Sequence, residues 1–419
     1  MSPSPDLVAR LLALLRQVRE KLGHEPLAAD AGTRFADVLD SMGFVEFLAL
    51  AAEDCGVSME DIERATGRRY GSVGELAAVL DPLGARACRP QVAGETPALR
   101  QSAAPIACLV ATAVGLPIHR QPASGINALL HRPPGWLEQH AGIEARCLWG
   151  KEDPLETAAR TAQDCLRQAG LSLSDVNALL VTSEAPPLLT GLAAALHTRL
   201  NLPSDAAALE IGGACTGFLA ALWTAQRLLA DATAVMVVAV ESPSRWLSLS
   251  PSPAGEAAAL FGDGAAACLL TSRPLNANAL RLREIILGTD GSASPLLCVE
   301  SVPGCEIELH MDGIALAHRA IRTMAEAVRR LCARHALTVD QIAAIIAHGG
   351  NGRMPPLLAR RLALPCQRVY SETARTGNLG SASLPVAWSA CDRSVSHPVI
   401  WTAVGAGLQW GAALFDASR

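Results

Sequence analysis

Three residues with chemically useful side chains stand where the chain is expected to turn. Cys215 follows a Gly-Gly pair that ends the run LEIGG and begins the apolar segment CTGFLAAL, a pattern that predicts strand, tight turn and helix. A thiol at a helix N-terminus has its pKa lowered, to between ~3.5 and ~7.5 in known cases, so the pattern predicts a stabilised thiolate nucleophile. His348 ends the apolar run IAAIIA, and Asn378 stands in the glycine-rich turn TGNLGS.

Each of the three also has an ordinary structural explanation. A single buried cysteine is more often a small hydrophobic side chain, and the other cysteines among the twelve are expected to have that role. A histidine at the end of a strand is more often structural than catalytic, and an asparagine in a turn usually serves the turn itself. The chemistry therefore depends on whether the fold brings the three together.

The composition excludes several classes of protein. Half of the 419 residues are hydrophobic, so a sizeable core is expected, and the net charge of −5 gives no reason to expect nucleic-acid binding. The cysteines form no C-x-x-C pairs, which argues against a zinc site or a disulfide framework. The N-terminus lacks a signal-peptide layout, and the longest weakly polar stretch, residues 103–118, is short for a membrane span. We expect a cytoplasmic protein without a metal or a membrane partner.

The elements that must position these residues fall into two blocks. Helical spacing of apolar residues predicts four helices within residues 1–82: over 6–23, from Asp40 or Ser41 onward, and over MEDIERATG (59–67) and SVGELAAVL (72–80), a small bundle. Residues 83–105 have no hydrophobic period and are rich in proline, so they are the predicted linker. From residue 106 to 419 strand-like apolar runs alternate with helical runs, which predicts a largely parallel sheet covered on both faces.

The segment D-S-M-G-F-V-E-F places Ser41 at the expected start of the second helix. Residues 1–85 hold 14 acidic and 8 basic residues. Together these features resemble the acyl carrier protein family, and the resemblance implies that Ser41 carries a covalent 4′-phosphopantetheine, attached by a phosphopantetheinyl transferase. A phosphodiester there would lie near the positive end of the helix dipole. The alternative is that Ser41 is only the N-cap of its helix.

The contexts of Cys215, His348 and Asn378, in this order, resemble the β-ketoacyl synthase III family of the thiolase superfamily. Four further segments match that family's motifs: PPGWLEQHAGIEAR, LFGDGAAACLL, HMDGIALAHRA and VGAGLQWGAALF. The resemblance covers nearly all of residues 106–419. It implies an α/β thiolase-like fold with duplicated mixed sheets and buried helices, in halves of roughly 106–275 and 276–419, and a homodimer.

The resemblance also implies a role for each residue. Cys215 would attack an acyl thioester and become acylated. His348 and Asn378 would donate hydrogen bonds to the thioester carbonyl of a second substrate while its carboxylate leaves as CO₂. The backbone N–H groups of Cys215 and Ala406 would form the oxyanion hole.

Four positions bear on the acyl donor. Trp136 stands where the family stacks a tryptophan on the adenine of coenzyme A, but the arginine expected four residues later is His140. Arg353 keeps the basic entrance position used for phosphate or carrier contact. The departure favours acyl-carrier over acyl-CoA as the donor, although simple packing is an alternative explanation for Trp136. Thr190, 25 residues before Cys215, stands where an aromatic residue commonly limits acyl length, and it predicts a roomier pocket.

These features predict a decarboxylating condensation. An acyl group on Cys215 is joined to a malonyl-type unit on a carrier, its own or a separate one, in polyketide or other specialised-metabolite biosynthesis. The first alternative is an acyltransferase that moves the acyl group between thioesters or onto a small acceptor without loss of CO₂. Asn378 favours condensation, because family members that only transfer often depart at that position. The second alternative is a non-catalytic partner subunit, against which the presence of Cys215 and His348 argues.

Overall fold

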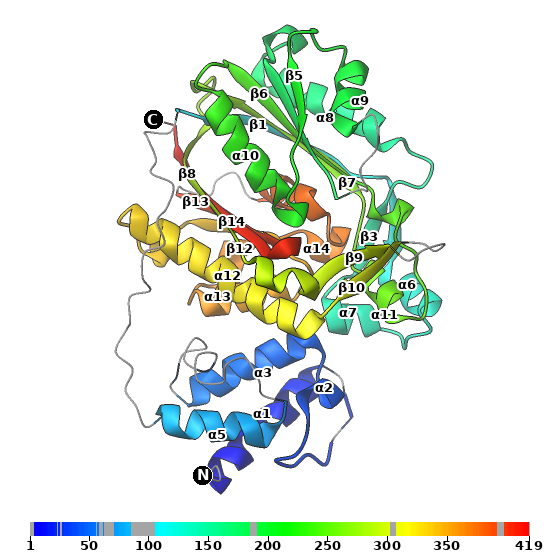
Figure 1. The fold of residues 1–419 in the computed structure, drawn as a ribbon, viewed down its shortest axis with the longest axis vertical. Helices are drawn as coiled ribbons and strands as arrows, with labels where there is room; N and C mark the ends of the chain where they lie inside the picture. Colours follow the sequence, from blue (N-terminus) through cyan, green and yellow to red (C-terminus); the bar gives the residue numbers. More distant parts are fainter. Residues whose placement is uncertain are drawn as a thin grey trace. The chain divides into compact units, whose positions relative to one another are not determined.

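The computed structural model describes residues 4–22, 24–25, 27–55, 57, 62, 71–84, 105–184, 191–301, 307–391 and 398–418. The chain divides into two compact units (Figure 1). The first comprises Met1–Gln101 and Gly313–His318, and the second comprises Ser102–Asp312 and Arg319–Arg419. Most of the predicted linker lies outside the described residues.

The described part of the first unit is helical. Its helices are α1 (Pro5–Lys21), α2 (Phe35–Val38), α3 (Ser41–Asp54) and α5 (Val73–Gly84). They share one apolar core, which includes Leu11, Leu15, Phe47, Leu48 and Leu76. The helices predicted over 6–23, from residue 40 or 41 onward and over 72–80 are confirmed as α1, α3 and α5. The helix predicted over 59–67 falls outside the described residues except for Ile62.

The N-terminus of α3 is capped by Asp40. Its carboxylate Oδ1 accepts the backbone N–H of Gly43 at 2.6 Å. An acceptor side chain one residue before the helix, bonded to an N–H of the first turn, is an N-cap. Ser41 as the N-cap is therefore wrong, because Asp40 has that role and Ser41 is the first helical residue. The side chain of Ser41 lies outside the described part of the structure.

Ten strands in the described part of the second unit form one sheet, in the order β12-β11-β13-β14-β8-β1-β7-β6-β4-β5. The strands are β1 (Cys108–Gly115), β4 (Ala178–Thr182), β5 (Ala207–Glu210), β6 (Ala234–Glu241), β7 (Gly264–Thr271), β8 (Leu280–Thr289), β11 (Ala344–Ala347), β12 (Val369–Tyr370), β13 (Val399–Gly405) and β14 (Gln409–Ala417). Smaller two-stranded sheets are formed by β2 (His119–Pro122) with β3 (Ala145–Leu148), and by β9 (Leu297–Ser301) with β10 (Ile307–Met311).

The large sheet is a duplication. From the middle outward, the order β1-β7-β6-β4-β5 of the first half is repeated as β8-β14-β13-β11-β12 in the second, and β1 and β8 meet in a short antiparallel pairing. β4, β5 and β6 run parallel, as do β11, β12 and β13, whereas β1, β7, β8 and β14 pair antiparallel. The duplicated mixed sheet is confirmed. The largely parallel sheet expected from the alternation of runs is wrong, because β7 in the first half and β14 in the second run antiparallel to both of their neighbours.

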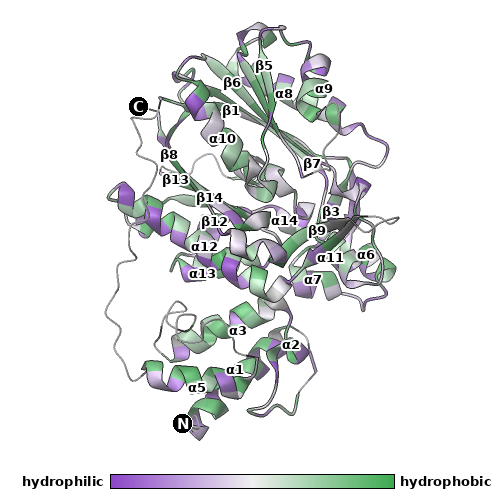
Figure 2. Ribbon diagram, in the orientation of Figure 1, coloured by the Kyte–Doolittle hydropathy of each residue, from purple (hydrophilic) through white to green (hydrophobic). Residues whose placement is uncertain are grey.

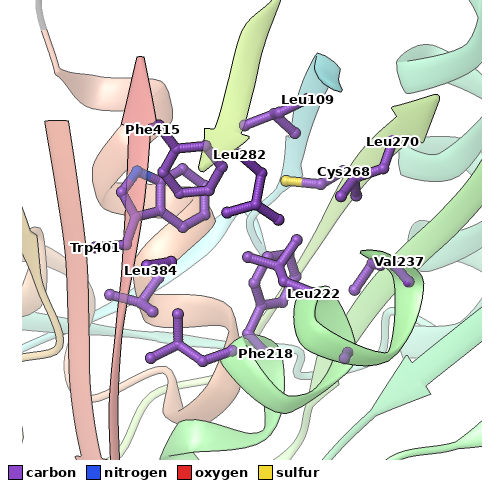
Figure 3. Close-up of a cluster of buried hydrophobic side chains, with 14 of the residues drawn as sticks. Leu109, Phe218, Leu222, Val237, Cys268, Leu270, Leu282, Leu384, Trp401 and Phe415 are labelled. Atoms are coloured by element: carbon purple, nitrogen blue, oxygen red, sulfur yellow. The ribbon is translucent and has the colours of Figure 1, made fainter. Parts of the chain in front are cut away.

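Helices lie on the outside of the sheet and also between its halves. They are α6 (Ala123–Leu129), α7 (Trp136–Ala141), α8 (Pro154–Ala169), α9 (Leu192–Leu200), α10 (Gly217–Leu228), α11 (Pro253–Ala258), α12 (Gly313–Arg334), α13 (Met354–Arg361), α14 (Thr373–Thr376) and α15 (Ser383–Ala390). α10 and α15 enter the core shared by both halves, where Phe218 and Leu384 join Trp401 and Phe415 (Figure 3). α8 and α9 cover the other face of the first half.

Because helices cover both faces, β4, β6, β7, β11 and β13 are buried along their whole length. Figure 2 shows hydrophobic residues along the central strands, while hydrophilic residues collect on outer helices such as α12 and α13. No helix among the described residues is long and apolar enough to cross a membrane.

Candidate active site

Cys215 stands in a strained turn between a strand and a helix. It occupies the 3₁₀ turn Ala214–Thr216, after β5 and directly before α10. The two residues before it have positive φ, 129° at Gly213 and 47° at Ala214. A positive φ at a residue other than glycine is uncommon and is typical of functional turns. A Cβ atom on Gly217 would lie 2.1 Å from Oγ1 of Thr182, so only glycine lets α10 start against the end of β4.

The pKa of the Cys215 thiol is raised well above its ordinary value. Burial is the main cause, since only 5% of the residue is exposed, and the negative charge of Glu184 adds to it. A hydrogen bond from the Asn378 side chain acts in the opposite direction, but it is the smaller effect. The lowered pKa predicted from the helix N-terminus is therefore wrong. Removal of the thiolate from water favours the protonated thiol at this position.

Asn378 is oriented toward Cys215 by three backbone contacts. Its side-chain Oδ1 accepts the N–H of Gly380 at 2.9 Å. Its own N–H donates to the carbonyl of Leu260 at 2.7 Å, and its carbonyl accepts the N–H of Gly262 at 2.9 Å. Because Oδ1 is engaged, the amide nitrogen is the group left to donate to the sulfur of Cys215. The structure brings these two predicted residues together.

His348 reaches the same region through β13. It follows β11, and its backbone N–H donates to the carbonyl of Thr402 in β13 at 2.9 Å. The end of that strand lies against the turn that holds Cys215, since a Cβ atom on Gly405 would lie 3.0 Å from the backbone nitrogen of Cys215. Burial lowers the pKa of His348 to about 4, and its Nδ1 has no hydrogen-bond partner among the described residues. The imidazole is therefore neutral near pH 7 and can donate one hydrogen bond.

The Gly405–Ala406–Gly407 turn holds Ala406, whose backbone N–H is the second donor of the predicted oxyanion hole. Gly405 has extended backbone, and Gly407 has a φ of 102°. Gly405 lies close to the backbone nitrogen of Cys215. Ala406 is the next residue after Gly405, so its N–H belongs to the turn that faces Cys215. The two predicted donors thus belong to touching turns.

Two carboxyl groups beside Cys215, of the partly buried Glu184 and the buried Glu241, are absent from the sequence prediction. Glu184 follows β4 and Glu241 ends β6, and these strands are parallel neighbours. The Cys215 thiol is within hydrogen-bonding reach of the Glu184 carboxyl. A signal was present in the sequence, because each acidic residue comes at the end of a buried parallel strand, the edge where sites form in such sheets.

The predicted entrance residues also lie together. The rings of Trp136 and His140 stack with centroids 5.2 Å apart, and His140 Nδ1 lies 2.9 Å from the carbonyl oxygen of Trp136. The guanidinium of Arg132 lies 5.3 Å from the indole centroid. Arg353 donates to the carbonyl of His140 at 3.3 Å. Thr190, the predicted pocket residue, lies outside the described residues.

The described residues hold no group of three or more His, Cys, Asp or Glu side chains arranged for a metal ion.

Comparison with known proteins identifies the family. The family "3-Oxoacyl-[acyl-carrier-protein (ACP)] synthase III" matches residues 209–291, and its C-terminal counterpart matches residues 332–417. The chain is 32% identical over 341 residues to the 3-oxopimeloyl-[acyl-carrier-protein] synthase of Rhodothermus marinus, covering 78% of this chain and 96% of that protein. It is 30% identical over 308 residues to the β-ketoacyl-[acyl-carrier-protein] synthase III of Oleidesulfovibrio alaskensis, covering 69% and 92%.

A solved structure agrees with these relatives. The 3-oxoacyl-(acyl carrier protein) synthase III, FabH, from Pseudomonas aeruginosa PAO1 superposes with a TM-score of 0.67 and 27% identity. The match covers 75% of this chain and 99% of that one. The chain therefore belongs to the 3-oxoacyl-[acyl-carrier-protein] synthase III family of thiolase-like condensing acyltransferases.

Proposed function

We propose that the protein condenses an acyl group held on Cys215 with a malonyl-type unit on a carrier, with loss of CO₂. The observation that carries this assignment is the pair formed by Cys215 and Asn378. Asn378 has its amide oxygen fixed by Gly380 and its nitrogen turned toward the sulfur. An amide donor beside an acylated cysteine is placed to stabilise an enolate that forms next to the acyl carbon.

The reaction runs in two half-reactions. In the first, Sγ of Cys215 attacks the acyl thioester, and the donor thiol leaves. In the second, the malonyl carboxylate departs as CO₂ and its electron pair forms an enolate on the thioester. Asn378 and the neutral His348 donate hydrogen bonds to that enolate oxygen. The enolate carbon then attacks the acyl carbon on Cys215, and the sulfur leaves to give a β-ketoacyl thioester.

Acyl transfer without decarboxylation is the alternative for the same nucleophile. It needs Cys215 and an oxyanion hole but no enolate donor. The orientation of Asn378 favours condensation, because transfer alone gives its amide nothing to stabilise.

A test separates these functions. The protein is first acylated with a thioester, and acyl-Cys215 is detected by intact-protein mass spectrometry with Cys215→Ala as the control. Malonyl carrier is then added, and CO₂ and the carrier-bound product are measured. Condensation predicts CO₂ and a β-ketoacyl carrier in equal amounts. An acyl carrier without CO₂ would support transfer, and absence of acyl-Cys215 would point to a non-catalytic subunit.

We also propose that the first unit is an acyl carrier with 4′-phosphopantetheine on Ser41. The capping contact of Asp40 supports this, because it makes Asp40 the N-cap and Ser41 the first residue of α3. The phosphodiester would sit at the positive end of a 14-residue helix. A phosphopantetheinyl transferase is the partner that this proposal requires.

The stacked rings at the predicted entrance bear on the identity of the acyl donor. The stacking of His140 on Trp136 occupies ring surface that an adenine would need, which supports a carrier-bound acyl donor over acyl-CoA.

A homodimer is expected from the edge strand β5, where Leu209 is 44% exposed, since an apolar sheet edge invites pairing. Sedimentation of the intact protein tests the dimer.

A further inference from the structure

The carboxyl groups of the partly buried Glu184 and the buried Glu241 adjoin Cys215, and neither has a role in the chemistry described above. We propose that Glu184 is the base that takes the thiol proton of Cys215 during acylation, and that Glu241 positions it. The inference rests on the proposed function only in taking Cys215 as the residue that becomes acylated. The proton acceptor of that step is then the side chain of Glu184.

The geometry of the pair comes from the sheet. Glu241 is the last residue of β6, and Glu184 lies two residues past Thr182, the end of the neighbouring parallel strand β4. The backbone N–H of Glu184 donates to Oε2 of Glu241 at 2.9 Å. The two strand ends thereby bring both carboxyl groups close to Gly380.

Gly380 makes room for both acids. A Cβ atom there would lie 2.8 Å from Cδ of Glu184 and 3.0 Å from Cδ of Glu241. Its φ of 51° adds a second reason for glycine. Because the N–H of this glycine also holds Asn378, the acid pair and the amide are fixed by the same turn.

Hydrogen bonding distinguishes the two acids. Oε1 of Glu241 accepts both the backbone N–H of Ser381, at 3.0 Å, and its hydroxyl, so Glu241 is fully engaged and only 1% exposed. Oε1 of Glu184 is buried and has no hydrogen-bond partner among the described residues. The carboxyl of Glu184 is within hydrogen-bonding reach of the Cys215 thiol. Glu184 is thus the free acceptor, and Glu241 is the anchored neighbour.

The charge balance favours transfer to Glu184 over loss of the proton to water. Burial raises the pKa of Glu184, and burial together with the charge of Glu184 raises the pKa of Glu241 further. Two carboxyl groups this close together hold one negative charge more readily than two, and Glu184 acts as the base in the form in which it carries that charge. Loss of the Cys215 proton to water would place a second charge in the same buried site, whereas transfer to Glu184 keeps the total at one.

The step balances without another reactant. The S–H bond of Cys215 breaks, its proton moves to the Glu184 carboxylate, and the sulfur forms a bond to the thioester carbonyl carbon. When the tetrahedral intermediate collapses, the donor's C–S bond breaks, and its thiolate takes the proton from Glu184. The products are acyl-Cys215 and the free donor thiol, with Glu184 ionised again.

The test is single-turnover acylation of Cys215 by a hexanoyl-pantetheine thioester, followed by mass spectrometry across a pH series. We expect Glu184→Gln to lower the acylation rate by about 10²–10⁴-fold and to remove the rise of rate with pH. Glu241→Gln keeps an amide in place of the anchored carboxyl. It should retain most of the rate and move the pH midpoint downward, because a neighbouring acidic group has gone.

A second variant shows whether a slow rate in Glu184→Gln reflects the lost carboxylate or a disturbed fold. Glu184→Ala should be as slow as Glu184→Gln, and added formate should restore part of the rate, since a small carboxylate can enter the space left. A Glu184→Gln rate within a few-fold of wild type at every pH, or no formate rescue of Glu184→Ala, would overturn the inference. Failure of the proposed function looks different: the wild-type protein would then carry no acyl group on Cys215.

Discussion

Gly405 lies against the backbone of Cys215, where a Cβ atom would be 3.0 Å from the nitrogen of Cys215 and 3.1 Å from that of Thr216. The backbone N–H of Cys215 and the turn that follows β13 therefore approach more closely than a side chain would permit. The backbone of Gly405 is extended, with a φ of −144°, so space and not conformation demands glycine there.

Gly405→Ala should displace the two turns that carry the proposed oxyanion donors. We expect the acylation rate to fall by about 10²–10³-fold, the usual effect of losing one such donor. Overpacking should also lower the free energy of unfolding by about 1–3 kcal/mol. Single-turnover acylation and urea denaturation measure the two effects. Gly125→Ala is the control, because a Cβ atom on Gly125 would meet no other atom within 4 Å; equal loss in both variants would contradict the prediction.

Asn378→Asp should separate the two half-reactions. Aspartate keeps an oxygen to accept the Gly380 N–H but cannot donate to an enolate. We expect CO₂ release from malonyl carrier to fall by about 10²–10³-fold, with much less change in the formation of acyl-Cys215. Asn378→Ala should behave similarly for CO₂ release. If the aspartate variant releases CO₂ at the wild-type rate, Asn378 does not stabilise the enolate.

His348 predicts a pH dependence of stability. Its pKa is about 4 in the folded protein and near its ordinary value of 6.5 when unfolded. Between these values the unfolded chain binds more protons, so this residue makes stability fall as pH drops from 6.5 toward 4, by up to about 1.4 kcal/mol per pH unit. His348→Asn should flatten that part of the curve in urea denaturation. His131→Asn is the control at an exposed position, and an identical slope in both would argue against a buried neutral imidazole.

Ser41 should be the site of phosphopantetheine attachment. Coexpression with a phosphopantetheinyl transferase should add the mass of one arm to the wild-type protein and none to Ser41→Ala. Ser72→Ala is the matched control, because Ser72 also stands at the start of a helix of the first unit, where its hydroxyl accepts the N–H of Glu75. An arm that remains on Ser41→Ala would refute the assignment.

His140→Arg should change the choice of acyl donor. In the wild type, His140 stacks on Trp136 with ring centroids 5.2 Å apart. Removing that ring frees the indole face, and an arginine adds a donor for phosphate groups. We expect the acylation rate with acyl-CoA to rise relative to acyl carrier. A parallel change with both donors, measured in single-turnover assays, would mean that His140 does not select between them.

Local patterns in the chain were enough to single out the candidate site residues and many of the elements. Cys215, His348 and Asn378 were recognisable because each stands in a short stretch with its own pattern: a Gly-Gly turn before a helix, the end of an apolar strand, a glycine-rich turn. The alternation of runs predicted an α/β fold, and helical spacing predicted α1, α3 and α5. Such patterns involve residues that lie only a few positions apart in the chain, so they can be recognised from the sequence alone.

The environment of the thiol, in contrast, depends on the tertiary structure. The pKa of Cys215 is raised rather than lowered, because the fold buries the sulfur and sets Glu184 beside it. Glu184 and Glu241 are 57 residues apart in sequence and meet because β4 and β6 pair, and Gly380 leaves the space for both. Desolvation and charge interaction depend on distances between segments that are remote in the chain. Local pattern singled out Cys215, whereas three-dimensional packing decided the environment of its thiol.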